Sequence, residues 1–373
     1  MGVRSLHVVA LDVPYPPDYG VVIDVYYRLR ALQQAGIAIT LHCFAYGRKP
    51  AAELERLCKT VWYYPRPRRL ADQLSVIPFI VRSRRPQELL RNLLADDAPI
   101  LFDGLHTCSF LPAPQLAGRR KAVRMQNVEW QYYRHLARYP SSLWKRIYYL
   151  TESIKLRWYE RILHHADLIF TVSRNDEAYY RRHHRQVHYL PVFHAHEQVS
   201  SLTGSGNFLL YHGKLSVPEN EQAARFILRH VAGNGLLPLV IAGRNPSASL
   251  QRVVAKCKHA ELIINPTEQQ LNVLLQQAHI HLLPTFQATG IKHKLLQALF
   301  AGRHVVVNPP MVAGTGLEPL CHVGDTAALL RRHLENLHDQ PFTEAERLRR
   351  QTILLNEFDN RKNADRLVSL MGL

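Results

Sequence analysis

Residues 282–302 read LLPTFQATGIKHKLLQALFAG, which is an apolar run, a loop and an amphipathic segment in direct succession. The pattern predicts that a strand ends early in this stretch and that a helix opens at the Thr289-Gly290 step. The first N–H groups of a helix have no partner within it, and the helix dipole favours negative charge there. Gly290 lets an anion approach the backbone, and Lys292 and Lys294 add positive charge. The stretch therefore indicates a phosphate-binding helix start, although a Thr-capped surface helix with solvated lysines has the same composition.

The bulk composition is that of a globular protein with more than one domain. A chain of 373 residues exceeds what one hydrophobic core usually serves, and a 47% share of hydrophobic residues excludes a disordered or fibrous chain. The net charge of +17 favours a polyanionic partner such as nucleic acid, anionic lipid or a phosphorylated substrate. No helix-turn-helix, zinc-finger or aromatic RNA-binding signature is visible in the sequence, so we expect no nucleic-acid partner.

The cysteines and the N-terminal residues predict a cytoplasmic protein. The five cysteines are scattered and form no C-x-x-C pair, which argues against a disulfide framework and a zinc site. The apolar run 6–11 is too short for a secretion signal or a membrane span, and no stretch of 18 apolar residues follows.

Strand-like and helix-like segments alternate along the chain, which predicts parallel sheets covered by helices. The expected strands are 6–11, 37–44, 61–64, 100–102, 122–125, 168–172 and 187–190, then 208–211, 237–242, 262–264, 280–283 and 305–307. We therefore expect an N-terminal Rossmann-like domain over 1–194, a linker over 195–206 and a second Rossmann-like domain over 207–343. A charged C-terminal helix over 344–373 is expected to pack back on the first domain.

The order of residues in the opening stretch resembles the donor-binding motif of glycosyltransferase family four, which reads T-G-I-K-x-K-x-x-E-A-x-x-x-G. The departure is Gln297, where the family has a Glu that holds the donor ribose. A Gln amide can still hydrogen-bond a diol, but more weakly than a carboxylate. The resemblance implies that the donor-binding residues of this motif are Thr289, Gly290, Ile291, Lys294 and Gln297, with Lys292 in a catalytic role.

Three further segments follow strands of the second domain. Residues 211–220 read YHGKLSVPEN, and the resemblance implies that Gly213 approaches the donor and that Lys214 neutralises the departing diphosphate. Glu219 and Asn220 stand near the place of a later Lys of the family. The loops that contain Arg244 and Pro266 match family loops that line the donor pocket.

The first domain offers candidates on the acceptor side. Residues 13–24, VPYPPDYGVVID, resemble a family loop in which Gly20 approaches the donor, with Val21 in place of a second glycine. His106 and Glu129 follow expected strands and are candidates to orient an acceptor hydroxyl. The alternative is a structural histidine and a surface acid. Gln126 stands where the family commonly has a His that contacts the transferring sugar.

A basic segment with aromatic residues, 62–85, has an apolar centre at 74–81 and suits an anionic membrane surface. The alternative is a buried helix whose arginines extend to solvent. A second basic aromatic run, 144–159, either extends this surface or forms a helix seated on the sheet.

The resemblance implies a GT-B fold, in which two doubly wound domains face a central cleft. It also implies retaining transfer of a sugar from a nucleotide-diphosphate donor to a glycan or lipid-linked acceptor in bacterial surface polysaccharide synthesis. The sequence has no Asp-x-Asp pair, so we expect neither a metal nor a cofactor. We expect a cytoplasmic enzyme, peripheral at the inner face of the membrane if the acceptor is a lipid. A catalytically silent relative and a nucleotide-sugar epimerase are the alternatives.

Overall fold

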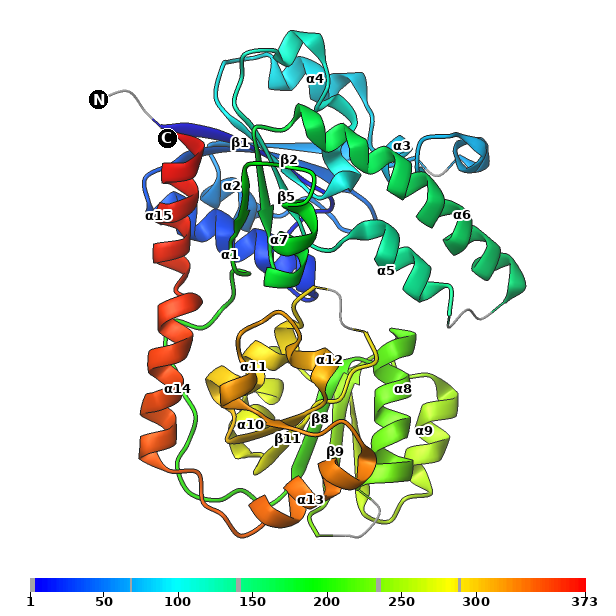
Figure 1. The fold of residues 1–373 in the computed structure, drawn as a ribbon, viewed down its shortest axis with the longest axis vertical. Helices are drawn as coiled ribbons and strands as arrows, with labels where there is room; N and C mark the ends of the chain where they lie inside the picture. The colour runs from blue at the N-terminus through cyan, green and yellow to red at the C-terminus, as the bar shows by residue number, and fades with distance from the viewer. Residues whose placement is uncertain (1–3, 68, 139–141, 233–235, 288–289) are drawn as a thin grey trace. The chain divides into compact units, whose positions relative to one another are not determined.

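The computed structural model describes residues 4–67, 69–138, 142–232, 236–287 and 290–373. The chain divides into two compact units (Figure 1). Unit 1 combines Met1–Ala195 with Phe358–Leu373, and unit 2 is His196–Glu357. Each unit has a parallel sheet with helices on its faces, which confirms the predicted α/β class.

Unit 1 contains a seven-stranded parallel sheet in the order β3-β2-β1-β4-β5-β6-β7. Its strands are β1 (Ser5–Ala10), β2 (Ala38–Ala45), β3 (Thr60–Pro65), β4 (Ile100–Asp103), β5 (Lys121–Met125), β6 (Leu168–Thr171) and β7 (Val187–Tyr189). Its helices are α1 (Gly20–Gln34), α2 (Ala52–Leu57), α3 (Phe79–Arg82), α4 (Gln87–Leu93), α5 (Glu129–Leu136), α6 (Leu143–Tyr159), α7 (Arg174–Tyr180) and α15 (Asn360–Met371). Short 3₁₀ turns at Leu70–Leu74 and Leu105–Phe110 lie between them.

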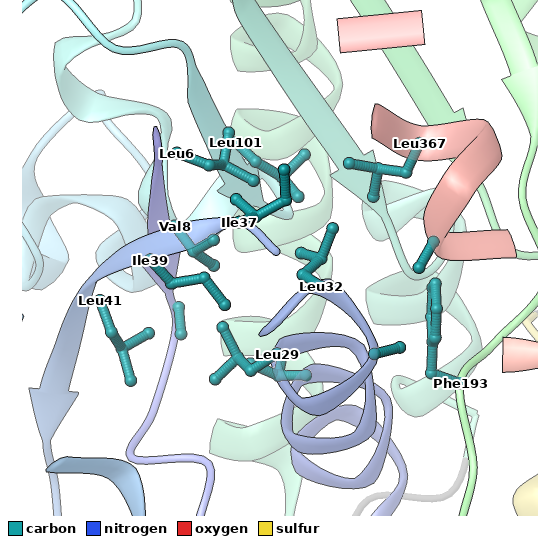
Figure 2. Close-up of a cluster of buried hydrophobic side chains, with 14 of the residues drawn as sticks. Leu6, Val8, Leu29, Leu32, Ile37, Ile39, Leu41, Leu101, Phe193 and Leu367 are labelled. Carbon is teal, nitrogen blue, oxygen red and sulfur yellow. The ribbon is translucent and has the colours of Figure 1, made fainter. Parts of the chain in front are cut away.

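One face of this sheet is packed against α1 and α15. Leu6 and Val8 of β1 meet Leu29 and Leu32 of α1, and Leu367 of α15 completes the cluster (Figure 2). All five side chains are fully buried. Burying a side chain of this size contributes roughly 1.5–3 kcal/mol, so α15 is an integral part of the core of unit 1.

Unit 2 contains a six-stranded parallel sheet in the order β10-β9-β8-β11-β12-β13. Its strands are β8 (Leu209–Lys214), β9 (Leu239–Arg244), β10 (Ala260–Ile264), β11 (Ile280–Leu282), β12 (His304–Val307) and β13 (His322–Val323). Its helices are α8 (Pro218–Phe226), α9 (Ala248–Ala255), α10 (Glu268–Gln277), α11 (His293–Ala301), α12 (Pro309–Val312), α13 (Ala327–Leu337) and α14 (Glu344–Glu357). The sequence analysis missed β13, because two residues are too short to show a period.

The C-terminal segment forms two helices rather than the single helix expected over 344–373. Helix α14 belongs to unit 2, where the buried guanidinium of Arg350 donates to the carbonyl oxygens of Gly302 and Arg303, both at 2.6 Å, just after α11. Helix α15 belongs to unit 1, and its N-cap Asp359 accepts from the backbone N–H of Lys362 at 3.0 Å. The first of the two helices is therefore part of unit 2, and the second packs within unit 1.

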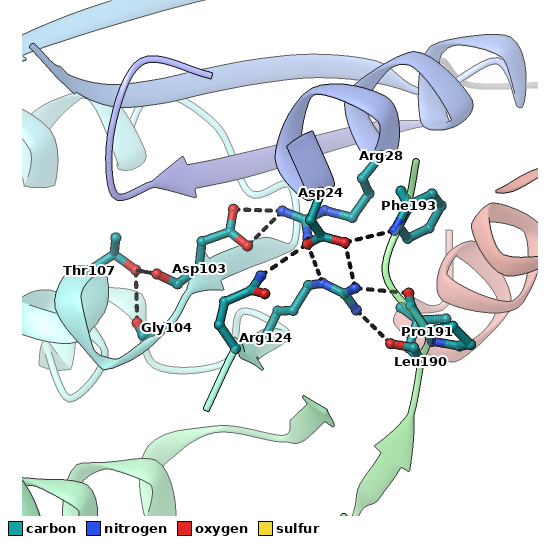
Figure 3. A network of polar contacts seen from close by, with 10 residues as sticks. Asp24, Arg28, Asp103, Gly104, Thr107, Arg124, Leu190, Pro191 and Phe193 are labelled. Atoms are coloured by element: carbon teal, nitrogen blue, oxygen red, sulfur yellow. Dashed lines mark hydrogen bonds and ion pairs between the residues drawn. The ribbon is translucent and has the colours of Figure 1, made fainter. Parts of the chain in front are cut away.

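A buried ionic network lies at the carboxyl edge of the first sheet (Figure 3). The carboxylate of Asp24 on α1 accepts from Arg28 at 2.9 Å and from Arg124 at 2.7 and 2.8 Å. Arg124 also donates to the carbonyl oxygens of Leu190 and Pro191. Burial alone would raise the pKa of Asp24, but the two guanidinium groups hold it well below its usual range. The network thus fixes α1 and the end of β7 to the strands between them.

A second buried chain of hydrogen bonds crosses β1, β2 and β3. Asp96 contacts Nε2 of His7 at 2.8 Å, Nδ1 of His7 contacts Nε2 of His42 at 2.8 Å, and Nδ1 of His42 contacts the Tyr64 hydroxyl at 2.9 Å. The chain ends where Asn92 donates to that hydroxyl at 2.9 Å. One set of neutral tautomers satisfies every link, because each ring then donates once toward Asp96 and accepts once. Burial lowers the pKa of His7 and holds that of His42 well below its usual value.

Acidification is expected to destabilise unit 1 through these two histidines. Because their pKa values lie below those in the unfolded chain, the unfolded state takes up protons first as the pH falls below about 6.5. Each such group then costs about 1.4 kcal/mol of unfolding free energy per pH unit. All four tryptophans of the chain lie in unit 1, so urea unfolding followed by tryptophan fluorescence reports on this unit. A His42→Gln variant should show a shallower acid slope, and an unchanged slope would contradict this explanation.

Candidate active site

The candidate donor residues of unit 2 lie at the carboxyl edge of its sheet, because all of its strands run parallel. Gly213 and Lys214 end β8, and in the strand register Lys214 pairs with Arg244 at the end of β9. A Cβ atom on Gly243 would collide with the Gly213 carbonyl oxygen, so the strands need glycine there to approach. Pro266 follows the end of β10 and is buried. Four residues predicted from three separate segments thus share one edge.

Helix α11 begins at His293 with Lys292 as its N-cap, three residues later than the sequence analysis predicted. The reason is Gly290, whose φ of +63° is incompatible with an α-helix, so the chain turns there before the helix starts. Gly290 and Ile291 therefore belong to the turn that leads into the helix. Thr289, which was expected to open the helix, lies outside the described residues.

Lys294 on the first turn of α11 contacts residues of β8 and α8. Its ammonium group donates to Asn220 Oδ1 at 3.0 Å and to the Tyr211 hydroxyl at 3.3 Å, and lies 4.9 Å from the centre of the Tyr211 ring. Burial lowers the pKa of Lys294 to about 8, although the nearby Glu219 opposes this shift. The group is thus a partly desolvated cation at neutral pH.

Asn220 links the two lysine-bearing segments. Its Nδ2 donates to the backbone carbonyl oxygen of Lys214 at 3.0 Å, while its Oδ1 accepts from Lys294. The neighbouring Glu219 accepts a short hydrogen bond from the hydroxyl of Thr285 in the loop after β11. The sequence analysis noted Asn220 and Glu219 only as occupants of the place of an absent lysine. The available signal was their position at the start of a helix that follows a glycine turn.

Gln297 lies one turn further along α11, beside His212 of β8. Burial holds the pKa of His212 well below its usual value, and the Gln297 side chain acts in the opposite direction. Gly302 at the end of the helix is required by close packing, because a Cβ atom there would overlap the His281 ring. Two residues of the motif thus have separate roles: Lys294 supplies a cation at the start of α11, and Gly302 allows the end of the helix to pack closely on the sheet.

Two candidates of unit 1 also follow strands. His106 comes after β4 and Gly104, and burial together with Arg84 and Arg66 holds the pKa of His106 well below its usual value. Glu129 is the first residue of α5, is 3% exposed, and has its pKa raised to about 8 by burial and by Asp176. Because Glu129 is buried, it is not a surface acid. The two pKa shifts favour an uncharged His106 ring and a protonated Glu129 carboxyl at neutral pH.

Gln126 and Gly20 lie close to the ionic network. Gln126 Nε2 donates to Asp24 Oδ2 at 3.0 Å, so the side chain that replaces the family histidine joins this network. Gly20 is the first residue of α1, after the N-cap Tyr19.

The segment 62–85 is neither one long helix nor a uniformly basic surface. Phe79, Ile80 and Val81 are buried, and Arg84 is 4% exposed and donates to the Leu11 and Ile80 carbonyl oxygens. The guanidinium of Arg66 lies over the Tyr46 and Phe79 rings. Arg66 and Arg84 thus make contacts within unit 1.

The described residues contain neither a metal-binding cluster nor a membrane-spanning helix. No group of three or more His, Cys, Asp or Glu side chains in that part of the chain is arranged to hold a metal ion. Within the same ranges, no helix has the length and apolar character needed to cross a membrane.

The whole chain has the fold of GT-B glycosyltransferases. It superimposes on the Anabaena protein HepE in complex with UDP and glucose with a TM-score of 0.67 at 11% identity, and covers 99% of both chains. For TarM the TM-score is 0.68 at 8% identity, with 100% of this chain and 99% of that one covered. For an α,α-trehalose-phosphate synthase (UDP-forming) from Burkholderia xenovorans, in complex with glucose-6-phosphate, it is 0.64 at 13% identity, with 99% and 100% covered.

Sequence comparison identifies a family model that matches part of the chain. Residues 206–339 match the family model "Glycosyl transferases group 1". The chain is also 26% identical over 328 residues to an uncharacterized 44.6 kDa protein in the cps region of Klebsiella pneumoniae, covering 83% of this chain and 84% of that protein. Residues 206–339 therefore match the group 1 glycosyltransferases and the chain has the GT-B fold, in agreement with the family that the motif at 289–302 indicated.

Proposed function

We propose that the protein transfers a sugar from a nucleotide-diphosphate donor to a glycan or lipid-linked acceptor, with retention of configuration, in capsular polysaccharide synthesis. The observation that carries this proposal is the link through Asn220, which joins the Lys214 turn to the Lys294 ammonium at the start of α11. Fixed cations at this edge of a parallel sheet suit a diphosphate. The relative from a cps region supports the proposed role in capsular polysaccharide synthesis. With a lipid-linked acceptor, the enzyme would work as a peripheral protein at the cytoplasmic face of the membrane.

The chemistry that these residues would supply is charge stabilisation. When the glycosidic bond breaks, its electron pair stays on the nucleoside diphosphate, and Lys214 and Lys292 would stabilise the added negative charge. The amides that follow Gly290, together with the dipole of α11, act in the same direction. The acceptor hydroxyl attacks the anomeric carbon from the face that the diphosphate leaves, and its proton passes to an oxygen of the departing diphosphate. In this proposal no metal ion is needed.

We assign the remaining donor-side candidates by their positions, and His106 and Glu129 by their charge states. Arg244, Pro266, Ile291 and Gln297 would line the base and ribose pocket, and Gly20 would approach the donor. In unit 1 the uncharged His106 can accept a hydrogen bond from the acceptor hydroxyl, whereas the protonated Glu129 can donate one.

The test is a screen of the purified full chain against UDP-, GDP- and dTDP-sugars. A donor present at 100 times its Kd should stabilise the protein by about 2.7 kcal/mol, which a thermal-shift assay detects. Release of nucleoside diphosphate in the presence of EDTA would then support metal-free turnover. If no donor stabilises the protein and none is consumed, the proposal is wrong.

Gln126 and Gln297 favour a second candidate, a relative that binds donor without turning it over, because both replace family residues. Thermal stabilisation without donor consumption would support this candidate. A new nucleotide sugar formed in the absence of any acceptor would instead indicate an epimerase.

The KM for the donor is expected to rise above pH 8. The pKa of Lys294 is lowered to about 8, so this group is charged below that pH and loses its charge above it. Losing a cation that faces a diphosphate should raise the KM by roughly tenfold between pH 7 and pH 9. A Lys294→Arg variant stays charged throughout this range and should show a flatter profile. Parallel profiles for both proteins would exclude Lys294 as the titrating group.

A further inference from the structure

Helix α6 of unit 1 exposes a row of large apolar side chains. Trp144 is 81% exposed, Ile154 and Trp158 are each 61% exposed, and Ile147 is 44% exposed. These positions recur every three or four residues or at multiples of that step, so they lie along one side of the helix. A helix with 17 residues is about 25 Å long, so the row is extended rather than local.

A neighbouring turn adds to this apolar surface. Leu74 and Val76 are 90% and 88% exposed. The turn is held beside α6 by two hydrogen bonds of 2.7 Å, from Lys155 Nζ to the Gln73 carbonyl oxygen and from the Phe79 backbone N–H to Glu152. We call the surface formed by Leu74, Val76, Trp144, Ile147, Ile154 and Trp158 the α6 face.

The charge around the α6 face is positive. Glu152 is the only acidic residue of α6, is 1% exposed, and is paired with Lys155 at 2.9 Å. Lys145, Arg146 and Arg157 are exposed on the same helix. The next acidic residue, Glu160, accepts hydrogen bonds from Tyr179 and Tyr180. The solvent side of α6 therefore combines apolar and basic side chains.

We propose that the α6 face docks on an anionic lipid bilayer. Exposed Trp and Ile side chains insert into the headgroup region, where Trp is enriched, and flanking Lys and Arg side chains attract anionic lipids. A second copy of this chain would bring the same positive charges against each other, which disfavours self-association through this surface. The surface differs from the expected segment 62–85, of which only Leu74 and Val76 take part. The proposal rests on this surface alone and does not depend on the sugar chemistry.

The experiment is vesicle binding by the full chain, measured by co-sedimentation and by tryptophan emission. Two of the four tryptophans, Trp144 and Trp158, lie on the α6 face, so docking should shift the emission to shorter wavelength. We expect binding to vesicles with 30% phosphatidylglycerol in phosphatidylcholine and at least tenfold weaker binding to pure phosphatidylcholine. Raising the salt concentration should weaken the binding. Equal binding to both vesicles, or none to either, would overturn the proposal.

The decisive variant is Trp144→Ser with Ile154→Ser, which should lower the vesicle partition coefficient at least tenfold. The matched control is Val273→Ser with Leu348→Ser, two exposed apolar residues of unit 2, which should bind like the unchanged protein. Circular dichroism and the thermal shift with a nucleotide sugar check the fold of both variants. If the first variant binds vesicles normally but changes the sedimentation coefficient, the α6 face is a protein interface instead. Vesicle binding without sugar transfer would leave this proposal standing and count only against the proposed function.

Discussion

Lys214→Ala and Lys292→Ala are each expected to lower kcat for sugar transfer by about 100- to 1,000-fold, the usual cost of removing one group that stabilises a developing anion. Both lysines stand at the carboxyl edge of the second sheet, Lys214 at the end of β8 and Lys292 as the N-cap of α11. The loss should fall on kcat more than on KM, because the charge on the diphosphate grows in the transition state.

The measurement is release of nucleoside diphosphate under saturating donor. Lys258→Ala is the matched control, since Lys258 is an exposed lysine of unit 2 away from the carboxyl edge, and it should leave kcat unchanged. If both site variants turn over donor at the rate of the unchanged protein, the assignment of these lysines is wrong.

Asp24→Asn is expected to lower the unfolding free energy of unit 1 by about 3–5 kcal/mol, because it leaves buried guanidinium charge without its carboxylate. Asp24 is fully buried and accepts from Arg28, Arg124, Gln126 and the backbone N–H of Phe193. An amide in its place would direct N–H groups toward the N–H groups of the arginines.

Urea unfolding followed by tryptophan fluorescence measures this effect. Asp97→Asn removes an exposed carboxylate of the same unit and should change the unfolding free energy by less than about 0.5 kcal/mol. A loss of similar size in both variants would mean that the network does not stabilise unit 1.

The strands of both sheets follow from the sequence because they are short apolar runs between polar loops. The predicted strand 100–102 became Ile100–Asp103, and 280–283 became Ile280–Leu282. The start of α11 was misplaced because a positive φ at Gly290 is a backbone property that residue type permits but does not require. The split between α14 and α15 was missed because both helices have the same charged composition.

The contacts that join distant segments could not be predicted from the sequence. His7 and His42 are ordinary polar residues in their strands, and only the pairing of β1 with β2 brings His7 Nδ1 within 2.8 Å of His42 Nε2. The Lys294–Asn220 contact likewise needs the first turn of α11 to lie beside the first turn of α8. In both cases the residue types were visible but their partners were not.

The place of α15 in the core of unit 1 has a consequence for dissecting the chain. Leu367 and Met371 are fully buried, and Asn360 both accepts from and donates to the backbone of His194. A fragment that ends at residue 195 would expose the apolar surface that α15 covers. The first sheet therefore depends on residues that come after unit 2 in the chain, and a soluble first half requires residues 358–373 as a fused or separately added peptide.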